Sequence, residues 1–161
     1  MTLREANTFA LDLIPELVPF CNRLEVVGSV RRKEEIVNDI DMLIDCEQPN
    51  FELLKNRLKE LNYIELPQAP PAIAVFELPE KVKIDFYTAN ENTWGILELL
   101  RTGPKQFNML FCGHAQFMGC KISGRGYAID QKGIKVFFHR ESEVFNYFTV
   151  TYILPEERGK E

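Results

Sequence analysis

The spacing of apolar residues divides the first half of the chain into alternating helices and strands. Helical spacing in residues 3–22 and 51–63 predicts an amphipathic helix in each range. Shorter apolar runs predict strands at 24–29 and 36–46, joined by a helical turn at 29–35. The proline-rich stretch 66–73 interrupts the pattern. The two runs that follow, 72–78 and 81–89, predict a β-hairpin.

The character of the chain changes after residue 90. Two helices are predicted at 91–102 and 103–119, because Gly103-Pro104 ends the first of them. Residues 127–138 predict a small hairpin that turns at 131–133. Ser142 is typical of a helix cap and begins a last helix over 142–150. The predicted fold is therefore α+β with two lobes: a mixed sheet with flanking helices in residues 1–90, and a small helical lobe with a β-hairpin in 91–161.

The strand at 36–46 carries acidic residues on the face turned away from the core. Successive side chains of a strand point to opposite faces. Ile40 and Met42 therefore face the core, whereas Asp39 and Asp41 share the other face. Asp45 lies on that face too, where we expect it to pair locally. Charges beside a core need partners, so the pattern indicates a cation near Asp39 and Asp41.

The strand at 81–89 repeats this arrangement. Apolar positions 82, 84 and 86 alternate with Lys83 and Asp85. If the two strands pair, Asp85 joins Asp39 and Asp41 in a cluster whose charges repel one another. Mg²⁺ prefers carboxylate oxygens together with substrate phosphate, so the cluster predicts a site for two magnesium ions and a triphosphate.

A Gly-Ser turn before the acidic strand supplies groups that bind anions. Gly28 lets the backbone approach a phosphate closely. Ser29 opens a helical turn, where exposed N–H groups favour phosphate. Arg31 and Arg32 follow directly, and a guanidinium can bind phosphate oxygens in a bidentate way. The turn and the acidic strand together predict a metal–triphosphate site.

These motifs resemble those of a known family. The run "GSVRR…NDIDMLI" with "KIDFY" is similar to the nucleotidyltransferase palm of the family X DNA polymerases, the polymerase beta group. "RTGPKQFN" resembles the family's Thr-Gly-…-Phe-Asn segment, and "YILPEER" resembles its closing Tyr-x-x-Pro-x-x-Arg stretch. The resemblance extends from about residue 3 to residue 158.

The resemblance implies a role for each matching residue. Asp39, Asp41 and Asp85 are the expected catalytic residues and ligands of two Mg²⁺ ions, for which Mn²⁺ can substitute. Gly28, Ser29 and Arg32 are expected to hold the triphosphate. Further nucleotide contacts are expected from Arg101, Thr102, Gly103, Lys105 and Asn108, and DNA contacts from Lys83, Lys121, Arg125, Lys132, Lys135 and Arg140. A cis bond is expected between Gly103 and Pro104.

The implied activity is that of a metal-dependent DNA polymerase. Such an enzyme would add deoxynucleoside monophosphates from dNTPs to a DNA 3′-hydroxyl in short-gap repair. The expected partners are primer–template or gapped DNA, a dNTP and repair proteins, and the protein is expected to be a monomer. Two alternatives stay open: nucleotide transfer without a template or to a non-DNA acceptor, and a non-catalytic nucleotide- or DNA-binding subunit.

Three departures from the family bear on these alternatives. Leu100-Arg101 stands in place of an aromatic pair, which leaves sugar discrimination open. Cys112 stands where many members carry an Arg against the template base, which leaves templating open. An N-terminal lyase domain is not expected before the palm.

Composition limits how the protein binds and where it is found. The formal net charge of -5 and pI of about 5.2 predict weak, salt-sensitive binding to DNA. The first residues are expected to form an amphipathic helix rather than a signal peptide, and no apolar run reaches membrane-spanning length, so we expect an intracellular, cytoplasmic protein outside the membrane. The four scattered cysteines are expected to be free thiols. Cys112, His114 and Cys120 are too few for a zinc site.

Overall fold

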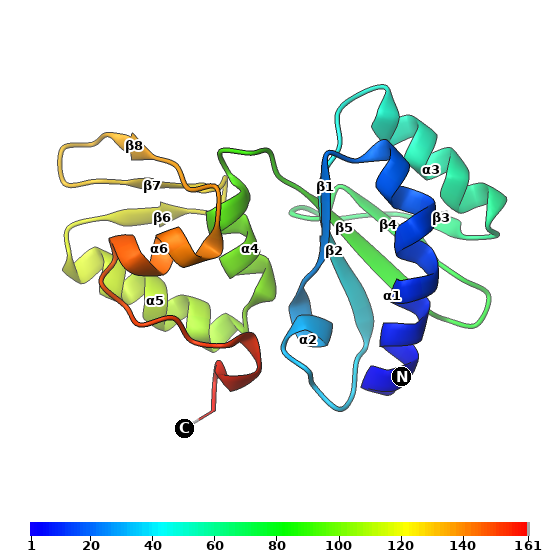
Figure 1. Ribbon diagram of the computed structural model, residues 1–161, viewed down its shortest axis with the longest axis horizontal. Coiled ribbons are helices and arrows are strands. Elements are labelled where there is room, and N and C mark those ends of the chain that lie inside the picture. Colours follow the sequence, from blue (N-terminus) through cyan, green and yellow to red (C-terminus); the bar gives the residue numbers. More distant parts are fainter. Residues whose placement is uncertain (161) are drawn as a thin grey trace. The chain divides into compact units, whose positions relative to one another are not determined.

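The computed structural model describes residues 1–160, which form two compact units (Figure 1). The first unit ends at Thr88 and the second begins at Ala89. The first contains a mixed sheet with helices, and the second contains helices and a smaller sheet. The α+β class predicted from the sequence is confirmed. No helix within residues 1–160 is both long and apolar enough to span a membrane.

The sheet of the first unit has five strands in the order β1-β2-β5-β4-β3. Only β2 and β5 pair in parallel, and the other neighbours are antiparallel. The strands are β1 (Arg23–Val26), β2 (Asp39–Asp45), β3 (Ile64–Leu66), β4 (Ala74–Glu77) and β5 (Lys83–Thr88). The predicted 72–78 and 81–89 hairpin is present as β4 and β5. Strand β3 was not expected, because three residues with mostly exposed side chains carry little periodic signal.

Helices α1 (Leu3–Leu17) and α3 (Asn50–Glu60) cover one face of this sheet. Ile40, Met42 and Ile44 of β2 are fully buried with them, as their alternation predicts. Helix α1 begins with a capping box in which Thr2 and Glu5 bond reciprocally. It ends at Leu17 rather than residue 22, and a 3₁₀ turn (Val18–Phe20) with a proline in its first turn follows.

Charged side chains occupy both edge strands of the sheet. On β3, the carboxylate of Glu65 lies 3.1 Å from Lys55 Nζ and 2.9 Å from Lys59 Nζ, both on α3. On β1, Arg23 Nη2 lies 2.9 Å from Glu25 Oε1. Each outer strand thus carries a local ion pair.

The second unit packs helices α4 (Trp94–Thr102), α5 (Lys105–Phe117) and α6 (Glu141–Tyr147) with a three-stranded sheet. The predicted hairpin is present as β7 (Tyr127–Ile129) and β8 (Lys135–Val136), and the unexpected β6 (Lys121–Ser123) extends it. Aromatic rings form much of the core: Phe111 packs edge-on against Phe145 and Phe148. Helix α6 begins at Glu141 with Arg140 as its N-cap, so the prediction that Ser142 caps it is wrong.

A buried ion pair ties the C-terminal segment to α6. Arg158 Nη1 lies 2.6 Å from Glu141 Oε1, and both side chains are almost fully buried. Tyr152 Oη donates to the other carboxylate oxygen of Glu141 at 2.9 Å, and Arg158 Nε donates to the carbonyl of Ile153 at 3.1 Å. The guanidinium also lies 5.1 Å from the ring centre of Phe107. Arg158, which directly follows the turn Pro155–Glu157, is thereby anchored to the core.

Candidate active site

Parallel pairing of β2 with β5 brings the three predicted carboxylates together. In the register of the two strands, Asp41 is paired with Asp85 and Asp39 with Lys83. The core-facing neighbours of these residues are fully buried, which turns all four side chains to the opposite face. The sequence predicted this grouping only if the strands were neighbours, and the structure places them side by side.

The carboxylate of Asp41 has the most unusual electrostatic surroundings of the three. Burial raises its pKa to about 7, and the negative charges of Asp39 and Asp85 act in the same direction. A hydrogen bond from Tyr87 and the charge of Arg32 oppose this shift. Tyr87 Oη, also on β5, donates to Asp41 Oδ1 at 3.1 Å. Burial and the two neighbouring carboxylates therefore disfavour the charged form of Asp41, and Tyr87 and Arg32 offset this effect only in part.

Lys83 lies directly against the carboxylates. Its Nζ is 3.1 Å from Asp85 Oδ1 and 3.7 Å from Asp39 Oδ2, and it donates a hydrogen bond to Asp85 Oδ2 at 3.3 Å. Partial burial would lower the pKa of Lys83. The hydrogen bond to Asp85 and the charges of the carboxylates outweigh this effect and raise its pKa.

The donor set suits a hard divalent cation, although it is not arranged around one. Within residues 1–160, no group of three or more His, Cys, Asp or Glu side chains has the geometry to hold a metal ion. Asp85 Oδ1 is nevertheless buried without a hydrogen-bond partner among these residues, despite its proximity to Lys83. A buried carboxylate oxygen without a hydrogen bond, beside two further carboxylates, is what Mg²⁺ would satisfy. The residues therefore fit the expected ion.

The Gly-Ser turn lies against the same carboxylates. Gly28 begins the four-residue helix α2 (Gly28–Arg31) with φ +62°, and a Cβ built on it would lie 1.9 Å from Asp41 Oδ2. The N–H of Val27 donates to the backbone carbonyl of Asp41 at 2.9 Å, which fixes the turn beside β2. Ser29 follows in α2 and is half-buried. Arg32 Nε donates to Glu34 Oε1 at 2.8 Å.

The predicted nucleotide segment joins α4 to α5 in the second unit. The peptide bond between Gly103 and Pro104 is cis, as predicted, and α5 begins at the exposed Lys105. Thr102 is buried and Arg101 is half-buried, and both interact with neighbouring groups. Asn108 Nδ2 donates to the carbonyl of Leu100 at 2.8 Å, while its Oδ1 is buried without a hydrogen-bond partner among residues 1–160. Asn108 thus links α5 to α4.

The remaining predicted DNA contacts lie on the surface of the second unit. Five exposed cations are spread over the three-stranded sheet, its turns and the start of α6: Lys121, Arg125, Lys132, Lys135 and Arg140. The Nζ of Lys135 lies 4.5 Å from the ring centre of Tyr127. The first unit has 10 Lys and Arg against 16 Asp and Glu, and the second has 9 against 8. The excess negative charge of the chain is therefore confined to the first unit.

Two comparisons with known proteins agree with the motifs. The family model for the DNA polymerase beta thumb matches residues 99–159. Repair DNA polymerase X of African swine fever virus (strain Badajoz 1971 Vero-adapted) is 26% identical over 141 residues, which cover 82% of this chain and 79% of the viral protein. The chain is a relative of the family X DNA polymerases. The thumb match lies within the second unit.

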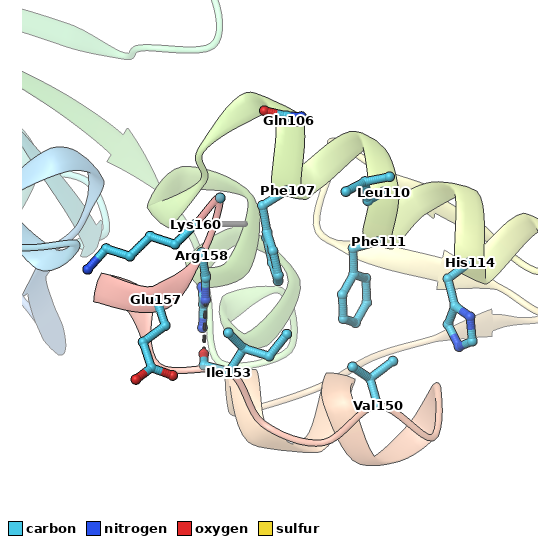
Figure 2. Close-up of a pocket in the computed structure, with 11 residues that line it drawn as sticks. Gln106, Phe107, Leu110, Phe111, His114, Val150, Ile153, Glu157, Arg158 and Lys160 are labelled. Atoms are coloured by element: carbon cyan, nitrogen blue, oxygen red, sulfur yellow. Dashed lines mark hydrogen bonds between the residues drawn. The ribbon is translucent and has the colours of Figure 1, made fainter.

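Two features of the structure were not predicted from the sequence. Tyr87 shares a face of β5 with Asp85, but its hydrogen bond to Asp41 depends on the register of two strands that are distant in the sequence. A second feature is an apolar groove of about 430 Å³ between α5 and the C-terminal segment. Figure 2 shows the rings of Phe107 and Phe111 on one side of it and Ile153 and Val150 on the other. None of the residues that line this groove is a predicted metal ligand.

Proposed function

We propose that the protein is a metal-dependent DNA polymerase that adds deoxynucleoside monophosphates from dNTPs to a DNA 3′-hydroxyl during repair of short gaps. The observation that carries this proposal is the parallel register that pairs Asp41 with Asp85. It sets the carboxylates of two strands on one face, beside a turn that only glycine can form without a clash. The likeness to a viral repair DNA polymerase X supports the same reaction.

In this proposal, each group has one task in the transfer. Asp39, Asp41 and Asp85 hold magnesium, which supplies Lewis-acid activation and charge neutralisation when bound. The absence of a Cβ on Gly28 keeps space beside Asp41. Ser29 and Arg32 bind the triphosphate, and Arg32 exchanges its partner Glu34 for a phosphate oxygen.

The second unit holds the DNA and the incoming nucleotide in this proposal. Its exposed cations contact the phosphate backbone, which positions DNA without reading its sequence. Lys105, at the exposed start of α5, contacts the nucleotide. Because the acidic excess lies in the first unit, the few cationic contacts have to overcome net repulsion. The affinity for DNA should therefore be low and should fall as the salt concentration rises.

Primer extension on gapped, recessed and single-stranded DNA, with each nucleotide offered separately, tests the proposal. We expect Mg²⁺-dependent, template-directed addition, most efficient at a short gap. Asp85→Asn should lower the rate at least about a hundredfold, because a metal centre loses one ligand and its charge. Asp45→Asn removes the same charge from the far end of β2 and serves as the matched control. Equal rates of nucleotide addition in Asp85→Asn and Asp45→Asn would refute the role of Asp85 as a metal ligand.

One observation favours a second candidate, nucleotide addition without a template. Helix α5 contains no Lys or Arg between Gln106 and Phe117. Cys112 is half-buried there, and Met109 and Phe117 are exposed. This part of the α5 surface therefore offers no Lys or Arg that could contact a template base or phosphate. Addition to single-stranded DNA at the rate seen on gapped DNA would favour this candidate over templated synthesis.

A further inference from the structure

Lys83 lies where a cation between the carboxylates would lie. It precedes Asp85 by two residues and is the register partner of Asp39, so its side chain rises from the sheet between them. The ammonium nitrogen lies within 3.1 Å of an Asp85 oxygen and within 3.7 Å of an Asp39 oxygen. One lysine therefore contacts a carboxylate on each of the two paired strands.

The exposure of the three side chains is unequal. The side chain of Asp85 is only 13% exposed, whereas those of Asp39 and Lys83 are 34% and 38% exposed. A lysine has a flexible four-carbon stem that can carry its charge into water without moving the backbone. The buried carboxylate has no such freedom. If another cation arrives, Lys83 is the group that can leave.

We propose that Lys83 is an internal counterion that a divalent cation displaces from Asp39 and Asp85. The inference rests on the proposed function, since the same carboxylates hold the metal there. In the absence of metal, the ammonium neutralises part of the crowded negative charge. A divalent cation offers twice the charge and direct oxygen coordination, but it has to break the lysine contacts before it can use the same oxygens. Lys83 therefore lowers metal affinity and stabilises the metal-free protein.

Binding of Mn²⁺ to the full chain, without nucleotide or DNA, tests this inference. The electron paramagnetic resonance signal of free aqueous Mn²⁺ gives the affinity directly. Lys83→Met should bind Mn²⁺ on the order of tenfold more tightly than wild type, a change of about 1.4 kcal/mol. Lys83→Arg keeps the charge and should stay close to wild type. In excess chelator, Lys83→Met should melt at a lower temperature than wild type, and saturating Mn²⁺ should abolish the difference.

A matched control separates the position of the lysine from its charge. Lys81 is two residues away, its side chain is 82% exposed, and its Nζ lies 3.7 Å from Glu77. Lys81→Met removes the same charge and should change Mn²⁺ affinity less than twofold. Equal tightening in Lys81→Met and Lys83→Met would mean that only net charge matters, and would overturn the inference. Weaker binding in Lys83→Met would overturn it too.

Asp85→Asn distinguishes failure of this inference from failure of the proposed function. If wild type binds Mn²⁺ and Asp85→Asn does not, the carboxylate site stands, and the Lys83 variants alone decide the inference. If neither the Lys83 variants nor wild type bind Mn²⁺ more tightly than Asp85→Asn, the metal site and the inference both fall.

Discussion

Gly28→Ala is the substitution for which the structure makes the sharpest quantitative prediction. Gly28 has a φ of +62°, which costs an L-residue about 1–2 kcal/mol. The new methyl group would lie 1.9 Å from Asp41 Oδ2, whereas real Cβ contacts are at least 3.0 Å. The flexible end of the Asp41 side chain has to move by about 1 Å. A misplacement of this size in a reacting site costs about a hundredfold in rate.

We therefore expect Gly28→Ala to lower the free energy of unfolding by about 1–2 kcal/mol and the rate of nucleotide addition about a hundredfold. Urea denaturation followed by circular dichroism measures the first quantity, and single-turnover primer extension measures the second. Gly113→Ala is the matched control, because its Cβ meets nothing within 4 Å on an exposed face of α5. It should stabilise the protein by about 0.5–1 kcal/mol. Wild-type activity in Gly28→Ala would refute the reasoning.

Three further predictions concern stability and binding. Glu141→Gln should lower the free energy of unfolding by about 3–5 kcal/mol, because it leaves the Arg158 guanidinium buried without its carboxylate. Fluorescence of Trp94, the single tryptophan, follows that unfolding in urea, and a loss below about 1 kcal/mol would contradict the prediction. Thr2→Ala should cost about 1 kcal/mol in thermal unfolding through loss of the capping box; an unchanged melting temperature would count against it. Lys135→Gln should weaken binding to all DNA sequences alike, and it should lower by about 1 the slope of the logarithm of the binding constant against the logarithm of the salt concentration. Fluorescence anisotropy measures both quantities, and a loss of affinity that depends on the DNA sequence would argue against backbone contact.

Much of the candidate site follows from the period-two alternation of two strands. The alternation in "DIDMLI" and "KIDFY" fixed which side chains share a face, and the buried Ile40 and Ile84 confirm it. Alternation carries no information about which strands are neighbours. The parallel register of Asp41 with Asp85 was therefore conditional in the sequence and is explicit only in the structure.

Other features were beyond reach because they depend on distant partners or on very short elements. The pair formed by Glu141 and Arg158 joins residues 17 positions apart, and neither residue type predicts burial. The end of α1 was predicted too late in the sequence, because apolar residues keep a helical spacing past Leu17 into a turn that contains a proline. Strands of three residues, such as β3 and β6, are too short for alternation to be distinguished from chance.

The ion pairs on the two edge strands have a consequence for solubility. An outer strand presents unpaired N–H and C=O groups, on which a strand of another molecule can assemble and start aggregation. Strand β3 is only three residues long, and its central Glu65 is held by two lysines of α3. Strand β1 carries Arg23 and Glu25 side by side. A strand added at either edge would have to bring its own side chains against these charges, so the sheet is protected from growing by recruitment of further copies.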